Sequence, residues 1–119
     1  MKVEELRNRT TTLANACIKV SVLLPGGNAL IHLVKEKLLQ HATELSVKTR
    51  ILGYPQNSEH FINRLNECAD ASNACGFWLE LVKAEQLMDM SLINPLIDEC
   101  DALLKLFLLV AKKSKDKLE

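Results

Sequence analysis

The chain has 119 residues, of which 48% are hydrophobic and only 4% aromatic, and this length and composition fit one helical domain with its own core. Fifteen Lys and Arg balance fifteen Asp and Glu, which excludes the strong net positive charge typical of nucleic-acid-binding proteins. The charge is unevenly spread: residues 1–53 carry eight basic and four acidic side chains, residues 54–90 two and six, and residues 91–119 five of each.

The first predicted helix covers residues 3–24. Its apolar residues alternate in spacings of four and three, which is the pattern of a helix that packs in a bundle. They are Leu6, Leu13, Cys17, Val20 and Leu24, with Thr10 in the one polar place. The stretch Pro25-Gly26-Gly27-Asn28 then predicts a turn, and Asn28 is expected to cap the next helix.

A second helix is predicted over residues 28–52. Its expected core face consists of Ile31, Val34, Leu38, His41, Leu45, Lys48 and Leu52. Because His41 and Lys48 are polar, the last turns of this helix are expected to pack more weakly than the first. Gly53-Tyr54-Pro55 is expected to end the helix, since the residue before a proline disfavours the helical conformation.

Residues 58–86 show the clearest helical pattern of the chain. Asn57 or Ser58 is expected to cap this third helix, and Glu59 lies in its first turn, where a negative charge is favourable. The alternation of four and three is unbroken along its core face. That face consists of Phe61, Leu65, Cys68, Ser72, Cys75, Leu79 and Val82.

The fourth predicted helix covers residues 92–114. Ser91 is expected to cap it, and Pro95 falls in its first turn, where the missing N–H costs little. Its core face consists of Ile93, Leu96, Cys100, Leu103, Phe107 and Val110. Four helices joined by short turns predict an all-α protein, an antiparallel four-helix bundle in up-down-up-down order that forms one domain over residues 1–119.

All four cysteines lie on predicted core faces, and no two have the Cys-x-x-Cys spacing of a zinc or redox site. They are Cys17, Cys68, Cys75 and Cys100, and we expect them to be buried and reduced. The first residues are charged, unlike a signal peptide, and no apolar stretch approaches the about 20 residues of a membrane span. We therefore expect a cytoplasmic protein without membrane association.

The sequence contains no catalytic motif. None of the three histidines follows a Glu by three residues, so the paired Glu-x-x-His motif of di-iron bundles is absent, as are phosphate-binding loops and nucleophile elbows. We predict a non-enzymatic protein with no catalytic, cofactor-binding or metal-binding residues. The alternative is a metal-binding or enzymatic bundle that uses His41 and the cysteines, but we interpret His41 as a core or subunit-contact residue.

Gly76, Phe77 and Trp78 form an unusual stretch in the third helix. A glycine in the middle of a helix costs about 1 kcal/mol relative to alanine, so it usually has a packing reason. Phe77 and Trp78 point away from the predicted core face and are bulky enough to anchor a contact. Together with Leu81 these residues are a candidate homo-oligomer interface. The alternative is a wide core that packs them against the first or fourth helix.

Six basic residues of the first two helices are candidate nucleic-acid-binding residues. They are Arg7, Arg9, Lys35, Lys37, Lys48 and Arg50. If several subunits pooled this charge, it would follow a phosphate backbone. The alternative is an ordinary solvated surface, and we expect no base-stacking aromatic side chain in this region.

About half of the chain, roughly residues 58–110, resembles a known family. Phe61-Ile62-x-Arg64-Leu65, Glu67-Cys68-Ala69 and Gly76-Phe77-Trp78-Leu79-Glu80-Leu81 resemble the third helix of the S23-type four-helix-bundle proteins encoded in 23S rRNA intervening sequences. Ile97-x-Glu99-Cys100-Asp101-x-Leu103-Leu104-Lys105 is similar to the start of that family's fourth helix. The aromatic-Trp-Leu pattern is also similar to the accessory variability proteins of diversity-generating retroelements.

This resemblance implies a left-handed bundle, a ring-shaped homopentamer and, for the retroelement relatives, binding of nucleic acid and a reverse transcriptase through basic surfaces. The sequence therefore favours a homo-oligomeric accessory or scaffold protein, with RNA, DNA or a reverse transcriptase as the expected client. The remaining alternative is a helical module that binds a protein partner and has no nucleic-acid role.

Overall fold

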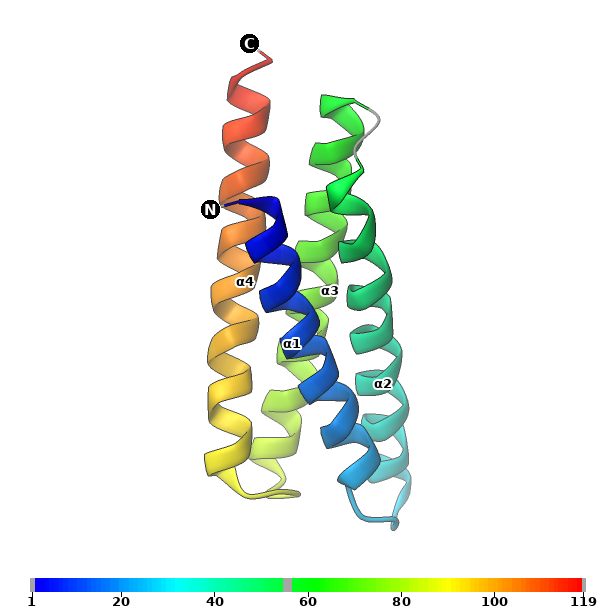
Figure 1. Cartoon of the computed structure of the whole chain (residues 1–119). Coiled ribbons are helices and arrows are strands. Elements are labelled where there is room, and N and C mark those ends of the chain that lie inside the picture. Colours follow the sequence, from blue (N-terminus) through cyan, green and yellow to red (C-terminus); the bar gives the residue numbers. More distant parts are fainter. Residues whose placement is uncertain (1, 55–56, 119) are drawn as a thin grey trace.

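The computed structural model describes residues 2–54 and 57–118. They form the helices α1 (Val3–Leu23), α2 (Ala29–Arg50), α3 (Ser58–Ala84) and α4 (Met90–Asp116), with a short 3-10 helix η1 (Ile51–Gly53) after α2. Successive helices run in opposite directions (Figure 1), which confirms the predicted antiparallel, up-down-up-down, all-α bundle. The predicted helix bounds agree with the observed ones to within two residues at each end. Among the described residues, no helix combines the length and apolarity that a membrane span requires.

The last three helices each begin at a side chain that accepts a backbone N–H. The predicted caps Asn28 and Asn57 accept from the residues three places later, at 3.0 and 2.8 Å. The prediction that Ser91 caps α4 was wrong, because Asp89 fills this role and accepts the Ser91 N–H at 2.9 Å. This hydrogen bond holds the pKa of the Asp89 carboxyl below its ordinary value, which fits a carboxylate at a helix N-terminus.

The end of α2 follows the prediction in part. The α-helix ends at Arg50, and the single turn of η1 closes with a hydrogen bond from the Tyr54 N–H to the carbonyl of Ile51, at 3.0 Å. Gly53 and Tyr54 therefore lie where the helix was expected to stop. Pro55, the third residue of the predicted stop, lies outside the described residues.

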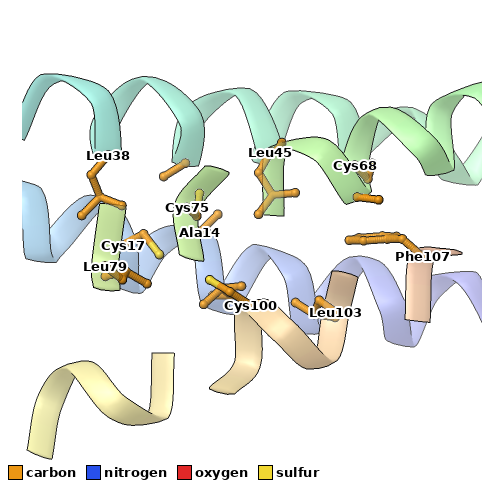
Figure 2. Packing of buried hydrophobic residues seen from close by; sticks show 14 of the residues in the cluster. Ala14, Cys17, Leu38, Leu45, Cys68, Cys75, Leu79, Cys100, Leu103 and Phe107 are labelled. Atoms are coloured by element: carbon orange, nitrogen blue, oxygen red, sulfur yellow. The ribbon is translucent and has the colours of Figure 1, made fainter. Parts of the chain in front are cut away.

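The core follows the predicted faces of α1, α3 and α4, with Phe61, Leu96 and Val110 half-buried at its edges. Phe107 of α4 is the largest of the fully buried side chains. Figure 2 shows it directed into the space between the helices, as are Leu38 and Leu45 of α2. The helices are therefore held together mainly by burial of aliphatic and aromatic surface.

The predicted core face of α2 was wrong at two places. Ala42 and Thr49 are buried where His41 and Lys48 were expected, and the latter two are half-buried at the edge of the core. There both contact Glu44, with His41 Nδ1 at 3.4 Å and Lys48 Nζ at 2.9 Å. The Thr49 hydroxyl donates to a carbonyl one turn earlier, at 2.7 Å. The helix turns its small residues inward because an unpaired charge costs more to bury than a satisfied hydroxyl.

The contact between α3 and α4 is the most extensive in the bundle, whereas α1 and α4 make few contacts. Gly76 lies where α3 and α4 approach closely, since a Cβ atom added to it would lie 3.4 Å from Cys100 Cβ. One turn earlier, the buried Ser72 hydroxyl donates to the Cys100 carbonyl at 2.9 Å. The glycine in the middle of α3 therefore has a packing reason.

We expect Gly76→Ala to raise the free energy of unfolding by up to about 1 kcal/mol, because alanine removes the glycine penalty and its Cβ just fits against Cys100. Gly76→Val should instead lower this free energy by about 1–3 kcal/mol, since its branched side chain overfills the contact. Urea unfolding followed by circular dichroism measures both changes. Equal stability of the two variants would show that α3 and α4 are not tightly packed at this level.

Candidate interaction surfaces

A groove of 420 Å³ lies between α3 and α4. Gly76 and Phe77 line it from α3, and Ile97 and Leu104 line it from α4. The side chain of Phe77 is 57% exposed, although it lies in the middle of a long helix. Two of the four residues of the predicted oligomer interface therefore lie at this groove.

The other two residues of that predicted interface, Trp78 and Leu81, are half-buried and pack against the core. The Trp78 ring meets the Phe77 ring edge to face, with ring centroids 5.0 Å apart and planes at 87°. Trp78 and Leu81 thus follow the alternative prediction, in which these residues belong to a wide core. The Phe77 side chain, in contrast, faces solvent. That the exposed ring contacts another subunit stays a prediction.

The groove has an acidic rim that the sequence reasoning missed. Glu80 comes from α3, and Asp98 and Asp101 come from α4. Lys105 Nζ lies 2.8 Å from Asp101, but Glu80 and Asp98 form no ion pair with any residue in the described ranges. In the sequence, the only sign of this rim is the spacing of Asp98 and Asp101 on one helix. Glu80 joins them only when α3 packs against α4.

Three of the six candidate nucleic-acid-binding residues are held by carboxylates or by a backbone carbonyl of the chain. Arg9 makes two hydrogen bonds to Glu99 of α4, with Nε–Oε2 at 2.7 Å and Nη2–Oε1 at 2.8 Å. Lys48 pairs with Glu44, and Lys35 Nζ donates to the carbonyl of the residue that directly follows α1, at 2.8 Å. Arg9 therefore links α1 to α4 where these helices make few other contacts, and the six residues do not act as one open surface.

Arg7 and Arg50 lie at the end of the bundle where α1 begins and α2 ends (Figure 1), whereas Lys37 lies in the first half of α2. Neither arginine forms an ion pair with a carboxylate of the described chain. The Arg7 guanidinium carbon lies 5.9 Å from the ring centre of Tyr54, whose side chain is 73% exposed. The turn after α2 thus brings an aromatic side chain next to the basic residues, where none was expected for base stacking. Whether Tyr54 stacks on a base stays a prediction.

The four cysteines are buried and form no disulfide, as predicted. Burial raises the pKa of Cys68 to about 11. The neighbouring thiol of Cys100, together with burial, raises the pKa of Cys17, and the thiol of Cys17 has the same effect on Cys75. Figure 2 shows the side chains of Cys17, Cys75 and Cys100 converging from α1, α3 and α4. Within residues 2–54 and 57–118, however, no group of three His, Cys, Asp or Glu side chains is arranged to hold a metal ion.

No family model matches the sequence, and no curated protein matches it. A solved structure has the same fold. It is the crystal structure of a protein of unknown function from the S23 ribosomal protein family of Bacteroides thetaiotaomicron. The similarity covers 94% of this chain and 99% of that chain, with a TM-score of 0.80 and 18% sequence identity.

The S23 family of this structural neighbour is the family that the sequence resemblance indicates. The TM-score of 0.80 establishes the shared fold, so the four-helix bundle that the resemblance implied is confirmed. The left-handed sense of the bundle, the ring of five subunits and the nucleic-acid or reverse-transcriptase client stay predictions.

Proposed function

We propose that the protein is a non-enzymatic, homo-oligomeric scaffold whose subunits associate through the face that α3 and α4 share. Phe77 carries this proposal, because its ring is 57% exposed at a groove that Ile97 and Leu104 line from the facing helix. Aromatic anchors next to a pocket dominate the energetics of many interfaces. Burying the exposed part of such a ring stabilises an assembly by on the order of 1–2 kcal/mol.

The surroundings of Phe77 favour a preorganised contact. Trp78 holds the Phe77 ring by an edge-to-face contact, so little side-chain entropy is lost when a partner covers the ring. Ile97 and Leu104 are half-buried in the facing wall of the groove and add apolar surface. The helices on both sides of the groove are packed together, so the site is formed before a partner arrives.

The placement of the reactive groups supports binding rather than catalysis. Cysteine thiols are the strongest nucleophiles of the chain, and those of Cys17, Cys68 and Cys75 are buried with raised pKa values that keep them protonated. The carboxylates of the groove lie on an open surface where water has access. This surface suits recognition of a partner.

Phe77→Ala tests the interface. We expect the variant to keep its helical content and to self-associate about tenfold to a hundredfold more weakly than the unmodified protein, since it loses a central aromatic anchor. Light scattering coupled to size exclusion over a concentration series measures this. Tyr54→Ala is the matched control, because it removes another exposed aromatic ring and should leave assembly unchanged. Assembly that survives Phe77→Ala intact would place the interface elsewhere.

Binding of single-stranded nucleic acid is the second candidate function, and Tyr54 beside Arg7 is the observation that favours it. An exposed ring with a cation over it provides a stacking surface for a base, and Arg50 adds charge at the same end of the bundle. In a homo-oligomer these sites would repeat, so a weak individual affinity would be multiplied. A reverse transcriptase that shares the same nucleic acid would then be a client of the scaffold.

Fluorescence anisotropy with a labelled oligouridylate tests this second function. Tyr54→Ala should weaken binding by about fivefold to a hundredfold, the range expected from loss of about 1–3 kcal/mol of stacking. Arg7→Gln should flatten the dependence of affinity on salt by about one unit of slope. Lys19→Gln, a change of charge on α1 away from Tyr54, is the control and should alter little. If neither Tyr54→Ala nor Arg7→Gln changes the affinity for the oligouridylate, only the scaffold function remains.

A further inference from the structure

The groove between α3 and α4 combines negative charge with apolar surface. Among the residues that the structure describes, the only charged ones that line it are the carboxylates Glu80, Asp98 and Asp101. Asp101 pairs with Lys105 on an exposed surface, whereas Glu80 and Asp98 have no ion-pair partner within the described ranges. Phe77, more than half exposed, stands beside these carboxylates. The complementary ligand is therefore both cationic and apolar.

The C-terminal part of α4 has the complementary composition. Exposed lysines, here called the lysine tail, lie in its last turns and directly after it: Lys112, Lys113, Lys115 and Lys117. The neighbouring Leu108 and Leu109 are 48% and 47% exposed. In Figure 1 this end of α4 extends beyond the start of α1, so one side of it has no helix of its own chain to cover it.

The lysine tail cannot reach the groove of its own chain. Lys112 follows Asp101 by eleven residues in the same helix, which is about 16 Å along the axis and well beyond the length of a lysine side chain. A helix that continues unbroken from the groove to the tail does not fold back. The tail of one chain is therefore available only to the groove of another.

We propose that the lysine tail of one copy of this chain docks on the acidic groove of a second copy. This inference rests on the proposed homo-oligomeric function and specifies its contact. The ammonium groups pair with Glu80 and Asp98. Leu108 and Leu109, which precede the lysine tail, cover Phe77. Because the two contacting surfaces differ, the contact is heterologous, and repeated addition of subunits closes a ring or extends a filament. Assembly should then weaken as the salt concentration rises.

Charge reversal on each side of the contact tests the proposal. Glu80→Lys with Asp98→Lys reverses the groove, and Lys112→Glu with Lys113→Glu reverses the tail. Each pair of substitutions should weaken self-association at least about tenfold, since like charges then face each other. The four substitutions combined in one chain should restore it, because opposite charges face each other again. Sedimentation velocity at low and moderate salt measures association, and circular dichroism verifies that every variant is helical.

Lys19→Glu with Lys83→Glu is the matched control for the tail variant, since it makes the same change in net charge on exposed residues outside both surfaces. This control should assemble like the unmodified protein. The proposal is overturned if the groove and tail variants also assemble normally, or if the fourfold variant fails to recover. In that case loss of assembly in Phe77→Ala would still support the scaffold function. An unmodified protein that is monomeric under all conditions would overturn both.

Discussion

Phe107→Ala is expected to lower the free energy of unfolding by about 3–5 kcal/mol, the largest effect of any single truncation in this core. Phe107 has 0% exposure and is the largest of the fully buried side chains. Its removal loses the transfer free energy of the ring and leaves a cavity among close-packed neighbours. Typical domains of this size are stable by only about 5–15 kcal/mol, so the variant should unfold at a much lower urea concentration.

Phe77→Ala provides the matched control, because it deletes the same ring from a position that is 57% exposed. At a protein concentration where both variants are monomeric, Phe77→Ala should change the free energy of unfolding by less than about 1 kcal/mol. Urea titrations that fit a common slope allow the two variants to be compared directly. Equal destabilisation by the two substitutions would mean that Phe107 does not lie at the centre of the core.

The four cysteines are expected to resist alkylation in the native protein by a factor on the order of 1,000 or more relative to the unfolded chain. Their thiols are buried, and the raised pKa of Cys17, Cys68 and Cys75 keeps these three thiols in the unreactive protonated form. Reaction therefore requires local or global opening of the bundle. Iodoacetamide labelling at mildly alkaline pH, followed by mass spectrometry with and without urea, measures the rate at each site.

Val47→Cys supplies an internal standard for that experiment. Val47 is 67% exposed on α2, so a cysteine at this position should react in the native state almost as fast as in urea. The four native cysteines of the same molecule should remain unlabelled over that time. Rapid labelling of any one of them would show that its helix opens locally, in conflict with a uniformly packed core.

Most of the fold could be predicted from the sequence because three of the four helices have a regular core face. In α3 the residues from Leu65 to Val82 that were expected inside are all buried. Asn28 and Asn57 also start their helices as predicted, because a side-chain cap is a local interaction that the neighbouring sequence determines.

The errors about the core face of α2 and the cap of α4 arose where a nearby residue took the predicted place. In α2 a strict alternation of three and four assigned His41 and Lys48 to the core, but the neighbouring Ala42 and Thr49 fill these places at lower cost. At the start of α4, the cap lies two residues before the predicted Ser91, and the Asp89 side chain accepts the hydrogen bond of the Ser91 N–H. Which residue fills such a place depends on tertiary packing and on how the backbone enters the helix. The spacing of residues along the sequence determines neither.

The surfaces were less predictable than the core because they depend on residues that only the fold brings together. Nothing near Arg9 in the sequence indicates a partner for its charge, yet Glu99, ninety positions away, forms an ion pair with it. Tyr54 belongs to the acidic segment of the sequence, yet its ring lies beside the Arg7 guanidinium. The acidic groove likewise requires α3 and α4 to pack side by side. Phe77 could be identified because a bulky residue opposite a regular core face must face outward.

The molar mass of the unmodified protein in solution, measured by light scattering after size exclusion, is the most direct test of the scaffold function. One chain has a mass of 13.3 kDa. We expect a defined multiple of this mass that decreases on dilution and at high salt, with five chains as the number implied by the family resemblance. A mass of one chain at every protein and salt concentration would contradict self-association and leave the four-helix bundle without its proposed function.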